Sequence, residues 1–489
     1  MIVGIDIGTQ SLKAVVADPA LRVLGAAAID YVPSFPRPGW AEQAPSLWEE
    51  ALPRAIGQAL AAADLAPARV AALGIAGQLD GCIPVDAAGE ALGPCLIWMD
   101  RRAEAELAGV DAVSLRARAG IVLDPSHMAA KIRWLKRHRA ERPAALYHQP
   151  VSYLVARLTG AKVFDHGLAS TSMLYDLRTR DFDPDLLRAF DIAAEELPKL
   201  DDAYASAGSL TGEGVRMSGL PEGIPVAVGT GDDFSAPFGG GLVSPGRLVC
   251  VLGTAEVIGA LHPEPVIDPQ GLVETHGYVT DGYFIENPGW LSGGALAWFL
   301  DTWRLSDCAE LDRLAAAVPP GAEGLTFLPA LSGAMAPEWI ASARGAFYGL
   351  TPAHGTGHMA RAVLEGCAFA MRDVIERLRS LGVSLESILL LGGGARSALW
   401  AQIRADVSGL PVEVPEMVDT SPLGAAMLAA VAAGLQPDPT TCATMVGGAS
   451  QTLPPRPAHA QAYDDAYARY RRLFDSLRPM YGGSEKGAM

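Results

Sequence analysis

Apolar runs that end in a Gly-Thr turn open each half of the sequence. In the first half, Ile2–Ile5 leads to Gly8-Thr9, and β-like segments follow at Ala14–Ala17 and Arg22–Ala28. The alternation of strand and turn predicts an antiparallel β-meander. A dinucleotide-binding glycine loop opens a helix instead, so the pattern argues against a Rossmann fold.

The same arrangement recurs near mid-chain. Leu248–Leu252 leads to Gly253-Thr254, and a second apolar run follows at Val257–Leu261. A hairpin is expected next, with Asp281-Gly282 supplying its two positive-φ positions. Gly-Thr is a common dipeptide and the repeat could be chance, but the shared context of strand, turn and strand favours a duplicated β-meander.

Helical periodicity accounts for much of the remaining chain. Ser46 is the expected N-cap of a helix that reaches Leu60 and bends at Pro53. Further helices are expected at Lys131–Arg139, Leu296–Trp303, Met359–Leu381 and Ala460–Leu477. Strands come first in each half and helices later, which predicts two α/β domains with mixed sheets and a cleft between them. A Gly/Pro-rich stretch, Pro237–Gly246, places the domains at residues 1–243 and 244–489.

Charge and composition narrow the function. The chain has 489 residues, and 38 basic against 55 acidic residues give a net charge of −17, which argues against a nucleic-acid partner. The six cysteines are scattered, and the N-terminus lacks a signal-peptide pattern. The longest uncharged run, 420–437, is interrupted by proline and glycine, so no membrane span is expected. These features predict a cytoplasmic protein without zinc or a disulfide framework.

The first turn combines groups that suit a phosphate. A Gly-Thr turn at a strand end presents N–H and hydroxyl donors to phosphate oxygens. Asp6, just before it, could hold magnesium, and Lys13, just after it, could neutralise charge. A plain hairpin turn with one surface lysine is the alternative interpretation.

Three consecutive glycines form a second candidate. Gly392–Gly394 lies between an apolar run and a helix expected at Ala398–Val407, so the backbone could approach a flat ligand such as a nucleotide. A tight β–α turn without a ligand is the alternative, and a lone glycine triplet does not decide between the two.

Two adjacent carboxylates, Asp232 and Asp233, follow the apolar strand Pro225–Val228 near the domain junction. If both face one cleft, their repulsion raises one pKa and prepares a proton acceptor. An Asx-turn or a helix cap is the structural alternative.

Polar groups around a tryptophan suggest a site for a polyhydroxylated ligand. Gln78-Leu79-Asp80 and the segment from Trp98 to Arg102 each follow an apolar stretch. Structural salt bridges are an equally good explanation for Arg102. The sequence contains no G-x-S-x-G nucleophile elbow, Walker loop or histidine-based metal spacing.

In this order, the segments resemble the FGGY carbohydrate kinases of the actin-like ATPase superfamily, and within them the xylulokinase branch. The most specific stretch is Gly345–Leu350 followed, after seven residues, by His358–Glu365, which is similar to the C-terminal signature of the family. Lys131–Leu135 resembles its N-terminal signature, with Met128 where a small residue or proline is usual. The resemblance covers nearly the whole chain and implies two ribonuclease-H-like domains.

The resemblance also implies roles for individual residues. Asp232 matches the catalytic base, and Asp6 the carboxylate near magnesium. The expected ATP contacts are Thr9, Gln10, Ser11 and Lys13 in the first loop, Gly253 and Thr254 in the second, and Gly393, Gly394 and Ser397 at the adenosine. The expected sugar contacts are Gln78, Leu79, Asp80, Trp98 and Asp233.

Several departures fall in or near these sites. Xylulokinases usually have Met-His at Leu79-Asp80 and Asn at Asp233, so this chain replaces a possible donor with a charged acceptor. Gln10 stands where Thr or Ser is commoner, and Ala334–Pro337 replaces Glu-Arg-Thr-Pro of many relatives. The changes in the sugar site put the substrate in doubt but leave the reaction intact.

The expected activity is therefore ATP- and Mg²⁺-dependent phosphorylation of a ketopentose, with D-xylulose preferred. The alternatives are another ketose or polyol acceptor, an actin-like switch ATPase, and a sugar-binding regulator without catalysis. A small sugar or polyol is the expected partner, nucleic acid and membrane are not, and a homodimer is an open option.

Overall fold

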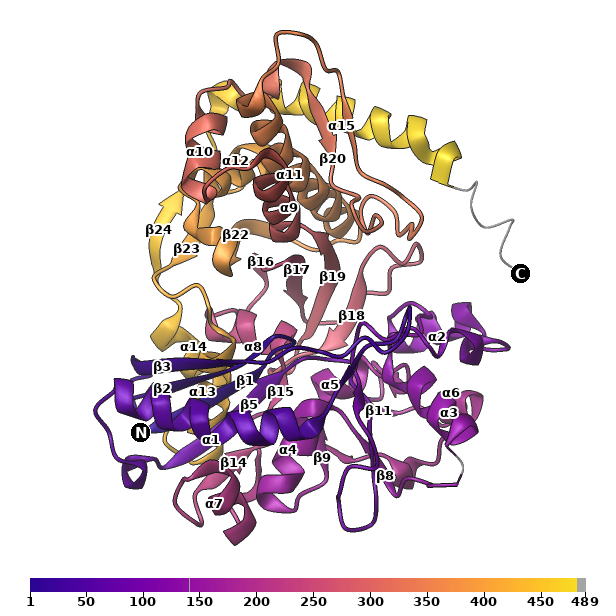
Figure 1. Ribbon diagram of the computed structural model, residues 1–489, viewed down its shortest axis with the longest axis vertical. Coiled ribbons are helices and arrows are strands. Elements are labelled where there is room, and N and C mark those ends of the chain that lie inside the picture. Colours follow the sequence, from indigo (N-terminus) through magenta and orange to yellow (C-terminus); the bar gives the residue numbers. More distant parts are fainter. Residues whose placement is uncertain (140, 482–489) are drawn as a thin grey trace.

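The computed structural model describes residues 1–139 and 141–481, which form two domains, each built around a mixed sheet (Figure 1). In the first sheet β1 pairs antiparallel with β2, β2 with β3, and β1 runs parallel to β5. The strand order is β13-β14-β5-β1-β2-β3, with β15 also paired to β5. The strands are β1 (Ile2–Ile7), β2 (Ser11–Ala17), β3 (Val23–Asp30), β5 (Ala72–Gly77), β13 (Ser206–Ser209), β14 (Pro225–Ala227) and β15 (Thr230–Gly231).

The second sheet repeats this plan. Its order is β18-β19-β17-β16-β22-β23-β24; β16 pairs antiparallel with β17 and parallel to β22, just as β1 pairs with β2 and β5. The duplicated meander is therefore confirmed, since each Gly-Thr turn joins the first two strands of its sheet. The strands are β16 (Gly246–Leu252), β17 (Ala255–His262), β18 (Glu274–Gly277), β19 (Tyr283–Leu291), β22 (Leu385–Leu391), β23 (Val412–Pro415) and β24 (Ala449–Leu453).

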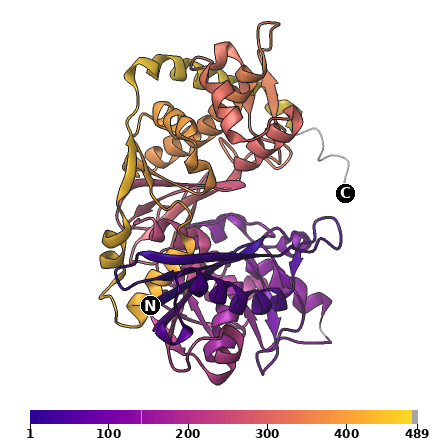
Figure 2. The same cartoon turned by 60° about the vertical axis from the view of Figure 1, so that its left-hand side comes forward.

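Helices surround both sheets (Figures 1 and 2). Those of the first half are α1 (Pro45–Ala62), α2 (Ala112–Ala119), α3 (Met128–His138), α4 (Pro150–Thr159), α5 (His166–Ser170), α6 (Pro184–Phe190), α7 (Gly212–Ser218) and α8 (Asp232–Gly239). Those of the second half are α9 (Gly293–Trp303), α10 (Cys308–Ala316), α11 (Thr356–Ser380), α12 (Ala398–Ser408), α13 (Ser421–Ala432), α14 (Pro439–Val446) and α15 (Ala460–Tyr481). Five two-stranded pairs complete the fold: β4 (Glu42–Gln43) with β7 (Cys95–Leu96), β6 (Ile83–Val85) with β8 (Leu146–His148), β9 (Val163–Asp165) with β12 (Lys199–Asp201), β10 (Tyr175–Asp176) with β11 (Asp181–Phe182), and β20 (Thr326–Leu328) with β21 (Ala346–Tyr348).

The six expected helices are present, with ends that differ by a few residues. Gly382 follows α11 with a φ of 87°, the left-handed conformation expected after a helix C-terminus. In α15 the aromatic stripe faces inward, and Tyr463, Tyr470 and Phe474 are buried. Rings of Tyr463 and Tyr470 contact that of Phe369 on α11. The apolar periodicity therefore identified both the helices and their buried faces.

Two local predictions are wrong. Ser46 is not the N-cap of α1: the helix begins at Pro45, whose fixed φ suits the first helical position, and Ala44 occupies the cap. Asp281 and Gly282 do not have positive φ values. The register pairs Gly277 with Tyr283, so five residues connect β18 to β19 rather than the two of a type I′ turn.

Helix α13 belongs to the second half of the sequence but packs on the first sheet (Figures 1 and 2). Glycines make this close packing possible: a Cβ atom on Gly4 of β1 would lie 1.9 Å from the Pro422 carbonyl oxygen. A Cβ atom on Gly74 of β5 would come equally near to the Ala425 carbonyl oxygen, at 1.9 Å. The first sheet is therefore completed by a segment from the far end of the chain. The boundary at 243/244 and the expected cleft between the domains stay predictions.

No helix in the described part of the chain is both long and apolar enough to cross a membrane.

Candidate active site

The first Gly-Thr turn connects β1 to β2, and side chains from distant parts of the first domain hold it. The hydroxyl of Tyr31 donates to the Gly8 carbonyl oxygen at 2.7 Å, and Gln43 Nε2 donates to the Thr9 carbonyl oxygen at 2.6 Å. Trp98 Nε1 donates to Thr9 Oγ1 at 3.0 Å. Because Thr9 Oγ1 accepts this bond, its own proton stays available to donate to a ligand.

Asp6 and Lys13 face each other across the β1–β2 pair. Asp6 is only 5% exposed, and within the described residues its Oδ1 atom has no hydrogen-bond partner. Burial raises the pKa of Asp6 to about 6, although Lys13 opposes the shift. A buried carboxylate oxygen without a partner is the kind of group that a magnesium ion or its water can satisfy.

Lys13 does not stand free beside the turn. Its Nζ atom lies 2.8 Å from Asp419 Oδ2, in the loop before α13. Burial disfavours the charged amine, but the charges of Asp6 and Asp419 outweigh burial and raise the pKa of Lys13. Lys13, the expected phosphate contact, is therefore charged and paired with the Asp419 carboxylate.

The two adjacent carboxylates, Asp232 and Asp233, open helix α8. Gly231 is the N-cap residue, so neither aspartate caps the helix. Burial, the charge of Asp233 and the charge of Asp6 raise the pKa of Asp232 well above its usual range. Burial, Glu286 and Asp80 do the same for Asp233. A carboxylate with a raised pKa is a stronger proton acceptor, which suits a general base.

The expected sugar-side residues follow β5 and β7. Gln78 Nε2 donates to Gln43 Oε1 at 2.6 Å, while its own buried Oε1 atom has no partner in the described chain. The ring of Trp98 is 44% exposed. A Cβ atom on Gly231 would meet Leu79 Cδ2 at 1.9 Å, so the Leu79 side chain packs against the start of α8. These contacts bring Gln78, Leu79 and Trp98 together with Thr9 and the α8 carboxylates.

The second Gly-Thr turn connects β16 to β17 and is held by backbone atoms. Gly293 N donates to the Gly253 carbonyl oxygen at 3.2 Å, and Gly294 N donates to the Thr254 carbonyl oxygen at 3.0 Å. Both donors belong to the first turn of α9. Thr254 is exposed, so its hydroxyl and the turn amides are accessible to a ligand.

The glycine triplet lies beside this second turn, between β22 and α12. Gly392 has a φ of 80°, and a Cβ atom on Gly394 would lie 2.8 Å from Leu252 Cβ. Apart from adjoining parts of the chain, no atom of the described residues lies within 4 Å of a Cβ position on Gly393, so that side is open. Ser397 caps α12, accepting from Trp400 N at 3.0 Å and donating to Asp312 Oδ2 at 2.7 Å. Both hydrogen bonds of the Ser397 hydroxyl are therefore made within the protein.

Several residues at the site were not expected from the sequence: Tyr31, Gln43, His127, Glu274, Glu286 and Asp419. Most occupy ordinary positions in loops or strands and acquire their place through contacts distant in sequence. Glu286 is the exception, because it directly follows the apolar run Tyr283–Ile285, and a carboxylate at that place could have drawn attention to it.

The chain matches known proteins over most of its length. Residues 1–239 match the N-terminal domain of the FGGY family of carbohydrate kinases, and residues 248–433 match the C-terminal domain. It is 31% identical to the xylulose kinase of Escherichia coli over 98% of this chain and 100% of that protein. It is 34% identical to the glycerol kinase of Gloeobacter violaceus over 89% of each.

A solved structure shares the architecture. The crystal structure of xylulose kinase from Rhodospirillum rubrum superposes with a TM-score of 0.90 at 29% identity, covering 98% of this chain and 99% of that chain. The expected pair of ribonuclease-H-like domains is therefore confirmed. The chain belongs to the FGGY family of carbohydrate kinases.

Proposed function

We propose that the protein transfers the γ-phosphate of ATP to a hydroxyl group of a ketopentose, with D-xylulose as the preferred acceptor. The observation that carries this proposal is the place where Asp232, Asp6 and the first Gly-Thr turn meet. It combines a proton acceptor of raised pKa, a carboxylate oxygen without a partner among the described residues, and hydrogen-bond donors that can contact a phosphate. Phosphoryl transfer needs positioning and charge neutralisation rather than a protein nucleophile, which is what this set offers.

Each group has a distinct part in the proposed reaction. Asp232 accepts the proton of the attacking hydroxyl and orients its oxygen toward the phosphate. Thr9, Lys13 and the amides of the Gly253-Thr254 turn hold the phosphates, while Gly393 and Gly394 leave room for the adenosine. Gln10 and Ser11 complete the first loop, and Ser397 fixes the start of α12 beside the adenosine.

Asp6 is the residue that would hold magnesium. Within residues 1–139 and 141–481, no three His, Cys, Asp or Glu side chains form a metal cluster. Magnesium commonly uses one or two carboxylates together with substrate phosphates, so a single buried carboxylate fits it. When bound, the ion supplies charge neutralisation for the phosphates.

The identity of the acceptor is the part of the proposal for which a specific alternative exists. Relatives of similar identity are named xylulose kinase and glycerol kinase. The charged acceptor Asp80, which replaces the usual histidine of the xylulokinase branch, also suits a simple polyol. Another ketose or a sugar alcohol, including glycerol, is therefore the second candidate.

ADP release tests the proposal. With ATP and Mg²⁺, we expect release to depend on the acceptor and to be fastest with D-xylulose across a panel of pentuloses, hexuloses and polyols. Asp232→Ala should abolish turnover while ATP binding, measured by calorimetry, persists. Near-normal turnover in that variant would remove Asp232 as the base, acceptor-independent hydrolysis would indicate a switch ATPase, and a strong preference for glycerol would favour the rival acceptor.

A further inference from the structure

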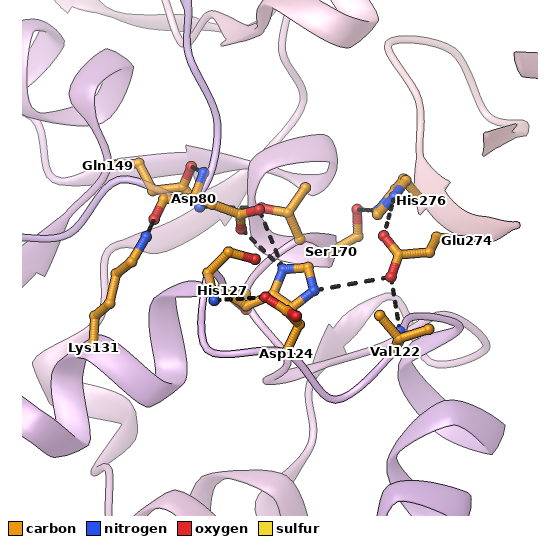
Figure 3. A network of polar contacts seen from close by, with 12 residues as sticks. Asp80, Val122, Asp124, His127, Lys131, Gln149, Ser170, Glu274 and His276 are labelled. Carbon is orange, nitrogen blue, oxygen red and sulfur yellow. Dashed lines mark hydrogen bonds and ion pairs between the residues drawn. The ribbon is translucent and has the colours of Figure 1, made fainter. Parts of the chain in front are cut away.

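Asp80 is the centre of a polar network that spans both domains (Figure 3). Its φ of 57° is the left-handed conformation that Asp tolerates better than most residues. Its N–H donates to Gln149 Oε1 at 3.0 Å, and its carbonyl oxygen accepts from Lys131 Nζ at 2.7 Å. Because both backbone groups are held, the direction of the Asp80 carboxylate is fixed by the fold.

His127 faces this carboxylate from the N-cap position of α3. Its Nδ1 atom lies 3.2 Å from each carboxylate oxygen of Asp80, and its Nε2 atom lies 3.9 Å from Glu274 Oε1 on β18. The ring is only 5% exposed. Burial disfavours its charge, but Asp80 and then Glu274 and Asp124 outweigh burial and raise the pKa of His127 to about 9. At pH 7 a charged imidazolium therefore lies between one carboxylate of each domain.

The second domain contributes further acidic groups. Glu274 Oε1 accepts from Val122 N at 2.8 Å. His276 Nε2 lies 3.2 Å from Glu286 Oε1, but burial lowers the pKa of His276 to about 4, so this ring is neutral at pH 7. Glu286 is 2% exposed, and its Oε2 atom has no partner among the described residues.

Asp80 follows Leu79, whose side chain packs against Gly231 at the start of α8. The charges of Glu286 and Asp80 both raise the pKa of Asp233, after burial, and Asp232 acts on Glu286 in the same way. Lys131, the other buried cation of the network, is engaged with the carbonyl oxygens of Asp80 and Ile97. His127 is therefore the cation that pairs with the Asp80 carboxylate.

Resting on the proposed kinase function, we propose that His127 is a positioning residue that holds the Asp80 carboxylate as a hydrogen-bond acceptor for the sugar, so that the site takes neutral polyhydroxylated acceptors and rejects sugar acids. A carboxylate has about four lone-pair positions, so the bonds to His127 leave others for acceptor hydroxyls. An anionic acceptor would meet the Asp80 carboxylate, and the cation beside that carboxylate, His127, is already paired with it. Removing His127 would leave the partly buried Asp80 charge unpaired, which is costly and would disturb its direction.

Kinetics of His127 variants test the inference. His127→Leu should raise the KM for D-xylulose about 10- to 100-fold, the usual effect of losing a hydrogen bond to a charged group. The KM for ATP should not change. His127→Asn keeps an N–H donor and should recover part of the loss. His138→Leu, at the exposed end of the same helix, is the matched control and should resemble the wild type.

The pH profile adds a readout that a purely structural role would not change. In the wild type, the KM for D-xylulose should rise as pH passes about 9, because His127 loses its proton there. The groups that face this ring are Asp80, Asp124, Glu274 and, through Glu274, His276. In His127→Asn the rise near pH 9 should be absent.

Three outcomes would overturn the inference. An equal rise in KM for ATP and D-xylulose in both His127 variants, or an unchanged KM with lower thermal stability alone, would make the role purely structural. Wild-type turnover of D-xylonate comparable to that of D-xylulose would contradict the rejection of sugar acids. An active kinase with these results leaves the proposed function standing, whereas absence of ADP release with every acceptor removes the proposed function and this inference together.

Discussion

The two Gly-Thr turns share a backbone plan but differ in what surrounds them. Three residues before the threonine the first turn has Asp6, where the second has Val251. Four residues after it the first has Lys13, where the second has Ile258. Tyr31, Gln43 and Trp98 side chains hold the first turn, whereas backbone atoms of α9 hold the second.

This difference distinguishes two tasks: offering N–H groups to an anion, and adding charged side chains beside it. A strand–turn–strand unit offers N–H groups to an anion whatever its sequence. The first turn adds Asp6 and Lys13 on its strand pair, whereas the second turn is followed by Glu256, which is fully buried in an ion pair with Arg404. Duplication of the backbone therefore supplies two turns whose N–H groups can face a phosphate, and the carboxylate oxygen left without a partner among the described residues is at the first turn. Exchanging the distinguishing residues tests whether the turns divide their work in this way.

The largest effect is expected from Asp6→Asn. The change removes the proposed magnesium carboxylate at almost constant shape, and kcat should fall about 1000-fold, the scale of losing several kcal/mol of charge stabilisation. The same variant should unfold at a higher temperature at neutral pH. The pKa of Asp6 is raised in the fold to about 6, so its charged form destabilises the folded state above that pH. Steady-state kinetics and thermal melts measure both effects.

The corresponding position of the second turn is the control for Asp6. Val251→Ala removes a partly buried side chain without changing any charge, and kcat should be retained with a loss of about 1 kcal/mol in stability. Equal losses of kcat in the two variants would show that the turns do not differ in chemistry.

A smaller effect is expected from Lys13→Met. Loss of a charge-assisted hydrogen bond to phosphate should lower kcat/KM for ATP about 10- to 100-fold. The variant also frees Asp419 from its ion pair. Ile258→Met at the equivalent position keeps the volume of a buried side chain and should leave ATP kinetics unchanged. If Lys13→Met binds ATP normally, the ion pair with Asp419 is structural and the lysine does not reach the phosphates.

The smallest effects compare how the two turns are held. Trp98→Phe removes the donor to Thr9 Oγ1 and should raise the KM values for both ATP and the sugar about fivefold, the value of one neutral hydrogen bond. Thr254→Val should raise the KM for ATP by a similar factor and leave the sugar KM unchanged, because the proposed role of its hydroxyl is to contact the phosphates of ATP. A sugar effect in Thr254→Val would contradict this separation.

The framework of the fold could be predicted from the sequence because it depends on local pattern. The two meanders, the helix at residues 356–380 and the glycine triplet follow from apolar periodicity and turn residues. The failures were also local: Pro45 displaced the cap expected at Ser46, and a five-residue loop replaced the turn expected at Asp281-Gly282. In each case a neighbouring residue or a strand register decided between two acceptable conformations.

The site was only partly predictable because its contacts join distant segments. Lys13 and Asp419 are 406 positions apart, and no local signal in the sequence connects them. In the sequence, His127 is only a residue near the start of a helix. The structure places Asp80 opposite it. Gln43 likewise gains its role only when β4 brings it to the first turn. Residue type indicated which groups could react, while tertiary packing determined which of them meet.

The position of α13 has a consequence for how the protein is made. Synthesis proceeds from the N-terminus, yet the helix that covers β1 and β5 comprises residues 421–432. At about 5–20 residues per second, the ribosome needs roughly 10–40 s to pass from residue 243 to residue 432. During this interval the first sheet lacks the helix that packs against Gly4 and Gly74. The first sheet is therefore completed only after most of the second half of the given sequence has been synthesised.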